Sequence, residues 1–301
     1  MRIHCLGGGL VGSFVTRRLV EAGFDVHLFD VVERESPATF HLGDALTSDH
    51  TQAQIIVNML PGSLGNKMTS LLKDSGQRIV DLSFSETTPD TLEDVSSTIL
   101  WDVGIAPGLS NMLVASAFRE FGSLDSVSIK VGGNPQQPDD EWSYMAPFSP
   151  HDVIAEYTRP ARVIQQGEQA EVPAMSELHS IDANGREMEA FLTDGLRSLL
   201  SLPAQKMGEY TVRWPGHIQR YQNTNLNPDE LVDAWALDPQ RSEFTWMEVC
   251  VSSGDETRTW IVEDLGKDGD SSMARTTGLV TACCVIAWID RPDMFGSGVF
   301  A

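Results

Sequence analysis

The sequence predicts an α/β protein in which a parallel sheet flanked by helices is interrupted by an inserted α+β domain with a mainly antiparallel sheet. Predicted strands and helices alternate between residues 2 and 104, as in a doubly wound parallel sheet. Strand-like alternation with two hairpin signals follows between residues 126 and 263. A long helical pattern over residues 272–289 could return the chain to the first sheet, so we expect the antiparallel part to be an insertion.

The first thirty residues carry the most specific signal. We expect a strand over residues 2–6, a helix over 13–22 and a second strand over 25–29 that ends at Asp30. The sequence GGGLVG, from Gly7 to Gly12, fits G-x-G-x-x-G. Because these glycines stand between a strand and a helix, with an acid at the end of the next strand, they predict the dinucleotide-binding turn of a Rossmann fold.

Each part of this turn has a separate physical role. Gly7 permits the tight turn, Gly9 lets the backbone approach a pyrophosphate, and Gly12 allows the helix to pack closely on the sheet. Leu10 and Val11 complete the turn, and the start of the helix offers unpaired N–H groups to the anion. The alternative is a structural glycine turn that binds no nucleotide.

Asp30 bears on the choice of cofactor. Its carboxylate can accept hydrogen bonds from both hydroxyls of an adenosine ribose and would repel a 2′-phosphate, which favours NAD over NADP. Further cofactor contacts are expected where other predicted strands end, at Asp44, Ala45, Leu60, Pro61 and Gly104. For Asp44 an ordinary Asp turn is an equally good interpretation.

Composition restricts the class of protein. With 301 residues the chain can form two domains, and 21% charged against 41% hydrophobic residues indicates a soluble globular protein. No apolar run approaches the roughly 20 residues of a membrane helix. The first strand begins at once, so we expect no signal peptide and a cytoplasmic location. The four cysteines lack C-x-x-C spacing, which favours buried thiols and no metal site.

The formal net charge is −22, from 21 basic and 43 acidic residues. This balance makes nucleic acids and anionic membranes poor partners. We expect a dinucleotide-binding domain over residues 1–110, a substrate-binding and dimerisation domain over 111–268, and a C-terminal helix over 269–301 that returns to the first domain. Asn184-Gly185 and Gly254-Asp255 are the two hairpin signals in the middle domain.

Several motifs resemble one known family. They follow one another in family order over most of the chain and are Val80-Asp-Leu-Ser-Phe84, Asp102-Val-Gly-Ile-Ala-Pro-Gly-Leu-Ser-Asn111, Val131-Gly-Gly-Asn-Pro135, Phe148-Ser-Pro150, Glu156-Tyr-Thr-Arg-Pro-Ala161, Glu189-Ala-Phe-Leu-Thr-Asp-Gly195, Arg213-Trp-Pro-Gly-His217 and Ser272-Met-Ala-Arg-Thr-Thr-Gly278. The sequence resembles the saccharopine dehydrogenase (reductase) superfamily, and within it the L-lysine 6-dehydrogenase-like branch.

This resemblance implies a Rossmann domain interrupted by a substrate domain that also forms a dimer interface. It implies hydride transfer between a nicotinamide and a carbon that bears an amine, with an amino acid as substrate. The chain departs from the family in two places. The segment after Asp30 is shorter than usual, and the sequence stops at Gly298-Val-Phe-Ala301, where relatives usually continue.

His217 is the leading candidate for the general base, because it follows a Trp-Pro-Gly turn in a matched motif and histidine titrates near neutrality. Its alternative role is that of a loop histidine that binds substrate or caps backbone. Asp102 and Asp194 are acidic alternatives, placed after predicted strands. Asp102 could hold the substrate ammonium, or it could cap the following helix.

Arginine is the side chain best shaped to bind the carboxylate of an amino acid. Arg213 is the first choice, since it lies four residues before His217 on a predicted extended segment. Arg275 and Arg159 are alternatives, although an ion pair is the better interpretation of Arg159. Three polar residues complete the expected substrate site, namely Tyr157, Thr193 and Ser272.

Together these features predict an NAD(P)-dependent amino acid dehydrogenase of the lysine 6-dehydrogenase or saccharopine dehydrogenase type, active as a homodimer. A non-catalytic NAD-binding sensor or scaffold of the same fold is the alternative. The arrangement of His217, Asp102 and Arg213 would discriminate between the two.

Overall fold

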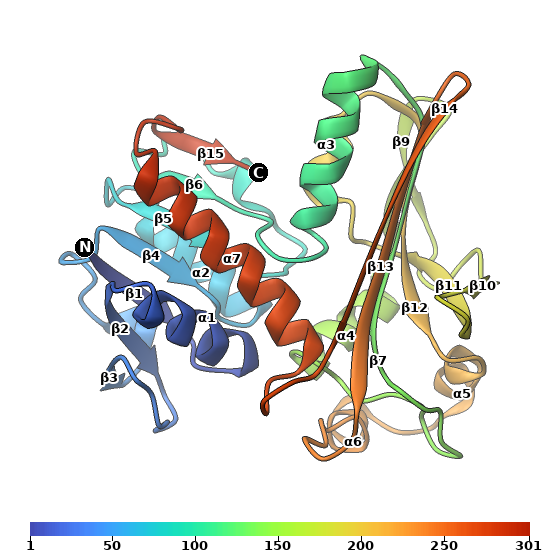
Figure 1. The fold of residues 1–301 in the computed structure, drawn as a ribbon, viewed down its shortest axis with the longest axis horizontal. Helices are drawn as coiled ribbons and strands as arrows, with labels where there is room; N and C mark the ends of the chain where they lie inside the picture. Colours follow the sequence, from blue (N-terminus) through green and yellow to red (C-terminus); the bar gives the residue numbers. More distant parts are fainter. The chain divides into compact units, whose positions relative to one another are not determined.

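A computed structural model describes residues 1–301 of the chain (Figure 1). The chain forms two compact units. Unit 1 comprises Met1–Gly108 and Ala274–Ala301, and unit 2 comprises Leu109–Met273. Unit 2 is therefore inserted in unit 1, and each is described by itself below.

Unit 1 contains a sheet of seven parallel strands in the order β15-β6-β5-β4-β1-β2-β3. The strands are β1 (Arg2–Leu6), β2 (Asp25–Asp30), β3 (Thr39–Leu42), β4 (Ile55–Asn58), β5 (Arg78–Asp81), β6 (Thr98–Leu100) and β15 (Gly298–Phe300). The helices are α1 (Leu10–Glu21), α2 (Gly62–Leu72) and α7 (Ser272–Asp290), with short 3-10 turns η1 (Ala45–Thr47) and η2 (Pro89–Thr91). The predicted doubly wound parallel sheet is confirmed.

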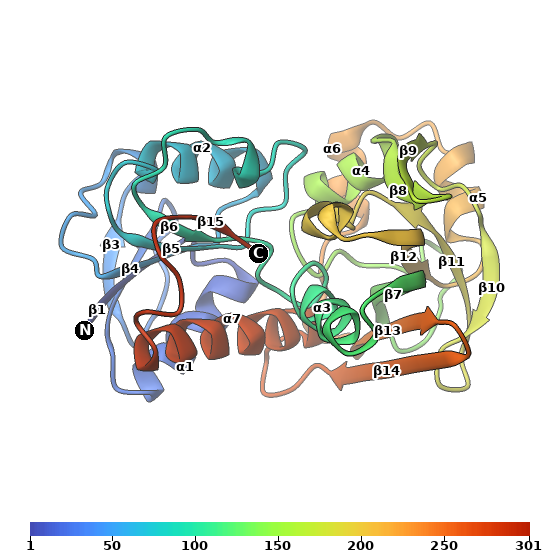
Figure 2. The same cartoon turned by 90° about the horizontal axis from the view of Figure 1, so that it is seen from above.

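Helices cover both faces of this sheet (Figure 2). Val15 and Leu19 of α1 and Val285 of α7 pack in one buried cluster on one face. Met68 and Leu72 of α2 pack in a second cluster on the other face. The five inner strands β1, β2, β4, β5 and β6 contribute side chains to both clusters, because successive side chains of a strand point to opposite faces.

Unit 1 contains a tight turn and a short strand that the sequence did not indicate. The turn is closed by a bridge between Ile105 and Gly108. The three-residue strand β15 was not anticipated, and it pairs with β6 in parallel at the edge of the sheet. No periodic pattern distinguishes so short a strand in the sequence.

The helix α7 corrects the statement that no apolar run approaches the length of a membrane span. Its 19 residues are long and apolar enough by composition to cross a membrane. In unit 1, however, its residues Ala282, Val285 and Trp288 are buried in the core beside α1 and the sheet. The helix is apolar because it packs against protein on much of its surface.

Unit 2 is built on an eight-stranded mixed sheet, with the strands β10-β11-β12-β7-β13-β14 in order and β8 joining β12 to β9. The strands are β7 (Leu124–Pro135), β8 (Ala161–Gln165), β9 (Glu168–Val172), β10 (His179–Asp182), β11 (Glu187–Thr193), β12 (Ala204–Arg213), β13 (Glu243–Ser253) and β14 (Glu256–Leu265). All pairs are antiparallel except β12 with β7. The predicted mainly antiparallel sheet is therefore confirmed, with one parallel pair.

Both predicted hairpins are present. Asn184 and Gly185 take positive φ values of 54° and 82° between β10 and β11. Gly254 takes a φ of 56° between β13 and β14. Positive φ at these positions is what Asn-Gly and Gly turns provide in tight hairpins.

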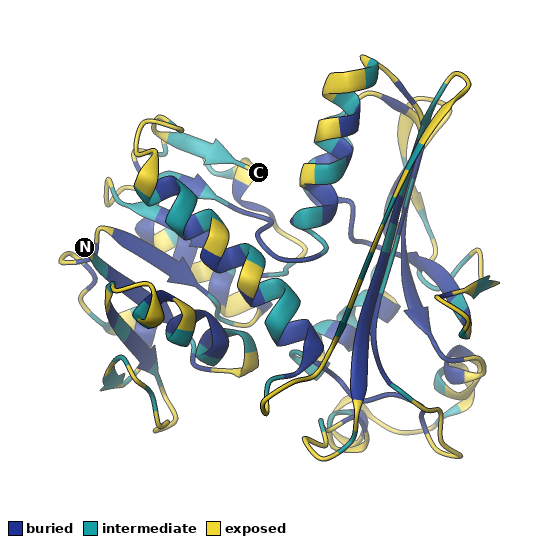
Figure 3. Ribbon diagram, in the orientation of Figure 1, coloured by how far each residue is buried: buried dark blue, intermediate teal, exposed yellow.

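Four helices flank this sheet, namely α3 (Leu109–Phe121), α4 (Pro150–Thr158), α5 (His217–Asn223) and α6 (Pro228–Ala234), together with the 3-10 turn η3 (Arg197–Ser201). The aromatic side chains of Tyr157, Trp235 and Phe191 pack in a buried cluster with Val153 and Ile218. The central strands β7, β12 and β13 are largely buried, whereas β14 alternates between exposed and partly buried residues (Figure 3).

Candidate functional site

The glycine turn of unit 1 is closed by two contacts that leave no room for side chains. Gly7 has a φ of +91°, and a Cβ there would lie 2.9 Å from the carbonyl oxygen of Met59. A Cβ on Gly12 would lie only 1.9 Å from the carbonyl oxygen of Gly7. The start of α1 therefore packs directly on the turn that leaves β1.

The turn leaves open space where an anion would bind. A Cβ built on Gly9 meets no atom within 4 Å. Gly9 is also the N-cap of α1, and no side chain caps the helix or places an acid in its first turn. The first N–H groups of the helix have no intrahelical partner, and Leu10 is 43% exposed beside them. These residues fit a pyrophosphate, which the helix dipole would favour.

Asp30 lies at the end of β2, beside this turn. Its carboxylate accepts hydrogen bonds from the backbone N–H of Gly8 at 2.6 Å and of Val32 at 2.8 Å, and Arg34 Nε donates at 3.2 Å. Burial alone would raise the pKa of Asp30, but these hydrogen bonds and the Arg34 charge lower it below its ordinary value. Asp30 is therefore ionised, and its carboxylate can accept further hydrogen bonds.

Sequence reasoning missed Arg34. Its side chain is 39% exposed and forms an ion pair with Asp30. The Arg34 Cδ lies 2.8 Å from the position that a Cβ on Gly8 would take, so the side chain covers the glycine turn. The nearby Arg34 reduces the repulsion that Asp30 would exert on a 2′-phosphate.

The remaining expected cofactor residues lie at the ends of strands or in the turns that follow them. Asp44 caps η1 through a hydrogen bond from the N–H of Leu46 to Oδ1, and Ala45 is buried. Leu60 follows β4, and Pro61 is the N-cap of α2. The Asp turn is thus present at Asp44, and its contact with adenine stays a prediction.

The segment after β6 places Asp102 and Gly104 in a compact turn of unit 1. Asp102 is buried and takes a φ of +55°, a left-handed conformation that is unusual for a residue with a side chain. A Cβ on Gly108 would lie 2.1 Å from the carbonyl oxygen of Gly104, so the turn depends on its glycines. Arg275, in α7, is partly buried.

A chain of hydrogen bonds in unit 2 joins three of the expected site residues. Arg213 Nε donates to the Tyr157 hydroxyl at 2.8 Å, and that hydroxyl lies 3.1 Å from His217 Nε2. His217 Nδ1 lies 3.0 Å from the Trp142 carbonyl oxygen. Because a carbonyl only accepts, Nδ1 carries the proton and Nε2 accepts from Tyr157.

These surroundings contradict the expectation that His217 titrates near neutrality. Burial, together with the Arg213 charge, lowers the pKa of His217 to about 3, although the bond to Trp142 opposes this. Both ring nitrogens are occupied, and the residue is the first of α5 and not part of a loop. His217 is a neutral hydrogen-bonding group, and its tertiary surroundings were not visible in the sequence.

Arg213 is buried without a carboxylate partner. Besides Tyr157, it donates through Nη1 to the Val212 carbonyl at 2.9 Å and through Nη2 to the Tyr144 hydroxyl at 3.4 Å. Its guanidinium carbon lies 4.3 Å from the centre of the Tyr144 ring. These three bonds leave two N–H groups of the guanidinium for another acceptor. A buried charge normally has a counter-ion, so this arrangement suits an anionic ligand.

Other expected site residues are engaged within unit 2. Asp194 forms ion pairs with Arg159 at 2.8 Å and Arg162 at 2.7 Å, in agreement with the ion-pair interpretation of Arg159. Thr193 Oγ1 lies 2.8 Å from Thr211 Oγ1. Ser272, the first residue of α7, is fully buried and donates its N–H and hydroxyl to Glu243.

Glu156 is a candidate that sequence reasoning quoted within a motif but gave no role. It lies on α4 next to Tyr157, is partly exposed, and its carboxylate accepts no hydrogen bond and forms no ion pair. Burial raises the pKa of Glu156 to about 7, although the Arg213 and Arg159 charges oppose the rise. A carboxyl group that titrates near neutrality is suited to proton transfer.

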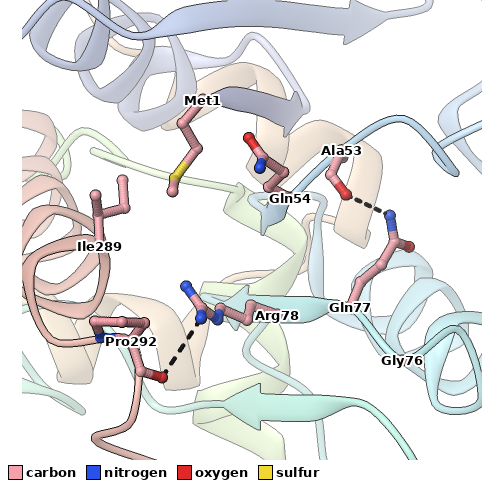
Figure 4. A pocket seen from close by; sticks show the side chains of 8 residues that line it. All are labelled: Met1, Ala53, Gln54, Gly76, Gln77, Arg78, Ile289 and Pro292. Atoms are coloured by element: carbon pink, nitrogen blue, oxygen red, sulfur yellow. Dashed lines mark hydrogen bonds between the residues drawn. The ribbon is translucent and has the colours of Figure 1, made fainter.

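A cavity of about 400 Å³ also lies in unit 1 (Figure 4). It is lined by Met1, Ala53, Gln54, Gly76, Gln77, Arg78, Ile289 and Pro292. Met1, Gln54 and Gln77 each lie at or just before the amino end of a strand. The cavity is therefore at the opposite end of the sheet from the glycine turn, and it is not the expected nucleotide site.

Comparison with known proteins agrees with this architecture. Residues 104–227 match the family described as the saccharopine dehydrogenase C-terminal domain. The structure also resembles apo saccharopine dehydrogenase (L-Glu forming) from Saccharomyces cerevisiae, with a TM-score of 0.74 and 14% identity over 100% of this chain and 93% of the other.

The structure is less similar to an aspartate dehydrogenase from Thermotoga maritima, with a TM-score of 0.46 and 10% identity. The alignment covers 98% of this chain and 97% of the other. The domain match and the shared fold agree with the saccharopine dehydrogenase superfamily that the sequence motifs indicated. Arg213, Tyr157, His217 and Glu156 all lie within the matched residues. The lysine 6-dehydrogenase branch stays a prediction.

The glycine turn of unit 1 allows a matched pair of variants. Gly9→Ala should leave the melting temperature unchanged, because its Cβ meets no protein atom, but should weaken NAD binding at least tenfold. Gly12→Ala should lower the melting temperature, because its Cβ would overlap the Gly7 carbonyl. Thermal unfolding and calorimetric titration with NAD measure both effects. Unchanged NAD affinity in Gly9→Ala would show that the pyrophosphate does not bind at this turn.

His217→Ala should destabilise the protein by about 2 kcal/mol or more, because it leaves the buried Tyr157 hydroxyl and the Trp142 carbonyl without partners. His151→Ala, at an exposed position of α4, is the control and should change stability little. Denaturant unfolding monitored by circular dichroism measures both. Equal stability of the two variants would contradict the structural role of His217.

Proposed function

We propose that the protein is an NAD-dependent oxidoreductase that acts on the C–N bond of an amino acid, of the lysine 6-dehydrogenase or saccharopine dehydrogenase type. One observation carries the proposal. The same chain combines an uncapped glycine turn followed by Asp30 with a saccharopine dehydrogenase C-terminal domain. The glycine turn with Asp30 supports nucleotide binding, and the C-terminal domain supports an amino acid as the substrate.

Asp30 supports NAD over NADP. The acids Glu33 and Glu35 flank Arg34 in the sequence, so the segment from Asp30 to Glu35 carries three acids against one arginine. This excess of negative charge would disfavour a 2′-phosphate, in spite of the ion pair between Arg34 and Asp30. When bound, NAD supplies the hydride acceptor.

The substrate requires an anchor for its carboxylate and an acceptor for its proton. Arg213 would bind the carboxylate through its two remaining N–H groups, while Tyr157 and His217 hold the guanidinium in position. Glu156 would take the proton from the substrate ammonium, because its carboxylate has no hydrogen bond and its pKa lies near 7. This role replaces the one expected for His217.

The non-catalytic NAD-binding scaffold is the second candidate, and one observation favours it. His217, Thr193 and Asp194 are already engaged by protein partners. A scaffold would bind NAD at the glycine turn and show no turnover. We also propose a homodimer in the cytoplasm, with no nucleic acid or membrane partner, on the grounds of the family resemblance and the net charge of −22.

Formation of NADH on addition of L-lysine, saccharopine or other L-amino acids tests the function. We expect turnover with at least one amino acid and a marked preference for NAD over NADP. Gly9→Ala is the matched control, because it should remain folded and lose turnover. NAD binding without turnover on the whole panel would leave the scaffold as the function. Absence of NAD binding would refute both candidates.

Glu156→Gln should lower kcat by about 100-fold, as expected for loss of a general base, and leave NAD affinity unchanged. In the wild type, oxidation should become faster as the pH rises through about 7, because Glu156 must lose its proton to act as a base. The variant should lose this inflection. A pH–rate profile of kcat checks both statements, and an unchanged profile would exclude Glu156 from proton transfer.

A further inference from the structure

Four of the seven histidines lie together in unit 1, and none of the four has been given a chemical role above. His4 comes from β1, His27 from β2, His41 from β3, and His50 from the segment before β4. His4 Nδ1 lies 3.0 Å from His50 Nδ1, and His27 Nδ1 lies 2.8 Å from His41 Nε2. The ring centres of His4 and His27 are 5.4 Å apart, so the two pairs form one cluster.

The partners of the first pair determine where its protons lie. His50 Nε2 lies 2.8 Å from the carbonyl oxygen of Ala45, which only accepts, so Nε2 carries a proton. Neutral His50 then has a bare Nδ1, and His4 Nδ1 must donate to it. If both rings were charged, two N–H groups would face each other at 3.0 Å. The pair can therefore bind one additional proton but not two.

The second pair obeys the same restriction. His27 Nε2 lies 3.3 Å from Asp25 Oδ1, which also accepts only. His27 Nδ1 is then bare in the neutral ring, and His41 Nε2 donates to it. If both rings were protonated, two N–H groups would again face each other, here with their nitrogens 2.8 Å apart. The intact cluster can bind at most two additional protons, whereas four separated histidines would bind four.

The surroundings disfavour even these protons. Burial and the neighbouring histidines lower the pKa of His4 to about 4, and burial and His27 lower the pKa of His41. The charged groups nearby are Arg2 on β1, Asp25 on β2 and Asp49 before β4. The carboxylate of Asp25 is already paired with Arg2, at 2.9 Å.

We propose that the four histidines form an acid-sensitive latch, which holds β3 and the segment 43–50 against the sheet when neutral and releases them on protonation. Four-residue β3 is an edge strand that pairs only with β2. His41 stacks on Phe29 with a centroid distance of 4.5 Å and a plane angle of 8°, and His50 contacts Phe29 edge-on. The ring contacts of these histidines therefore provide much of the packing that holds β3 and the segment 43–50 against the sheet.

The direction of the effect follows from proton binding. Above about pH 6.5, the ordinary pKa of histidine, neither the closed nor the open form binds extra protons. Below it, the open form binds up to four extra protons, whereas the closed form binds none at first and never more than two. The opening constant should therefore rise as the pH falls, by up to about 10⁴-fold per pH unit while the closed form binds no proton and by about 100-fold per pH unit once the closed form has bound two.

The latch lies next to the proposed nucleotide site. Asp30 directly follows Phe29, and its carbonyl accepts a hydrogen bond from the N–H of Gly43 at 2.9 Å. The segment 43–50 also carries Asp44 and Ala45. If the proposed function is correct, opening removes the adenine side of the cofactor site, and bound NAD keeps the latch closed by mass action. This coupling rests on the proposed function, whereas the latch itself does not.

The variant His4→Asn/His41→Gln tests the latch. In each case the new amide nitrogen can replace the imidazole N–H that donates to the partner histidine, and the amide cannot be protonated. Should the double variant not fold, His4→Asn and His41→Gln alone each disable one pair. His151→Gln, exposed on α4 of unit 2, is the matched control.

Amide hydrogen exchange of residues 39–50, corrected for intrinsic rates, should accelerate at least tenfold between pH 7.5 and 5.5 in the wild type and in His151→Gln. The double variant should lose this pH dependence. Exchange that is equally protected at both pH values, or equally pH-dependent in the double variant, would overturn the latch. Saturating NAD should suppress the opening at pH 5.5. Acid opening that NAD leaves unchanged would support the latch and contradict the cofactor assignment.

Discussion

The burial of the Arg213 guanidinium is the constraint on which much of unit 2 depends. Only 3% of the residue is exposed, and no carboxylate forms an ion pair with it. A charge can be removed from water in this way only if polar groups replace its hydration. Tyr157 from α4, Tyr144 and the Val212 carbonyl do so, and His217 from α5 holds the Tyr157 hydroxyl in turn. One cation thus fixes the positions of two helices against β12.

Much of the fold could be predicted from the sequence in detail, because the rules that apply to it are local. The glycine turn, the alternation of strands and helices, and the Asn184-Gly185 hairpin each depend on a few adjacent residues. The inserted position of unit 2 also followed, from a single apolar helical pattern at 272–289. Short elements such as α5 and β15 were missed because three to seven residues carry too little periodicity.

The roles of polar residues could be predicted less well, because they depend on burial by distant parts of the chain. His217 looked like a base that titrates near neutrality, and only its contacts with Tyr157 and Trp142 show a neutral, fully bonded ring. Glu156 is the opposite case, since its raised pKa arises from burial that no spacing in the sequence reveals. Arg34 escaped attention because its ion pair with Asp30 depends on how the chain turns after β2.

The insertion of unit 2 into unit 1 has a consequence for biosynthesis. All of residues 109–273 leave the ribosome before residues 274–300, which contribute most of α7 and all of β15 to unit 1. The inserted unit can therefore begin to fold while its host still lacks one helix and one edge strand. During that interval the α7-facing core of the nascent host, including Val15, Val57 and Val80, is uncovered. Such exposed apolar surface is what chaperones bind. Unit 1 contains the strand β1 but is completed only after the whole of unit 2 has been synthesised.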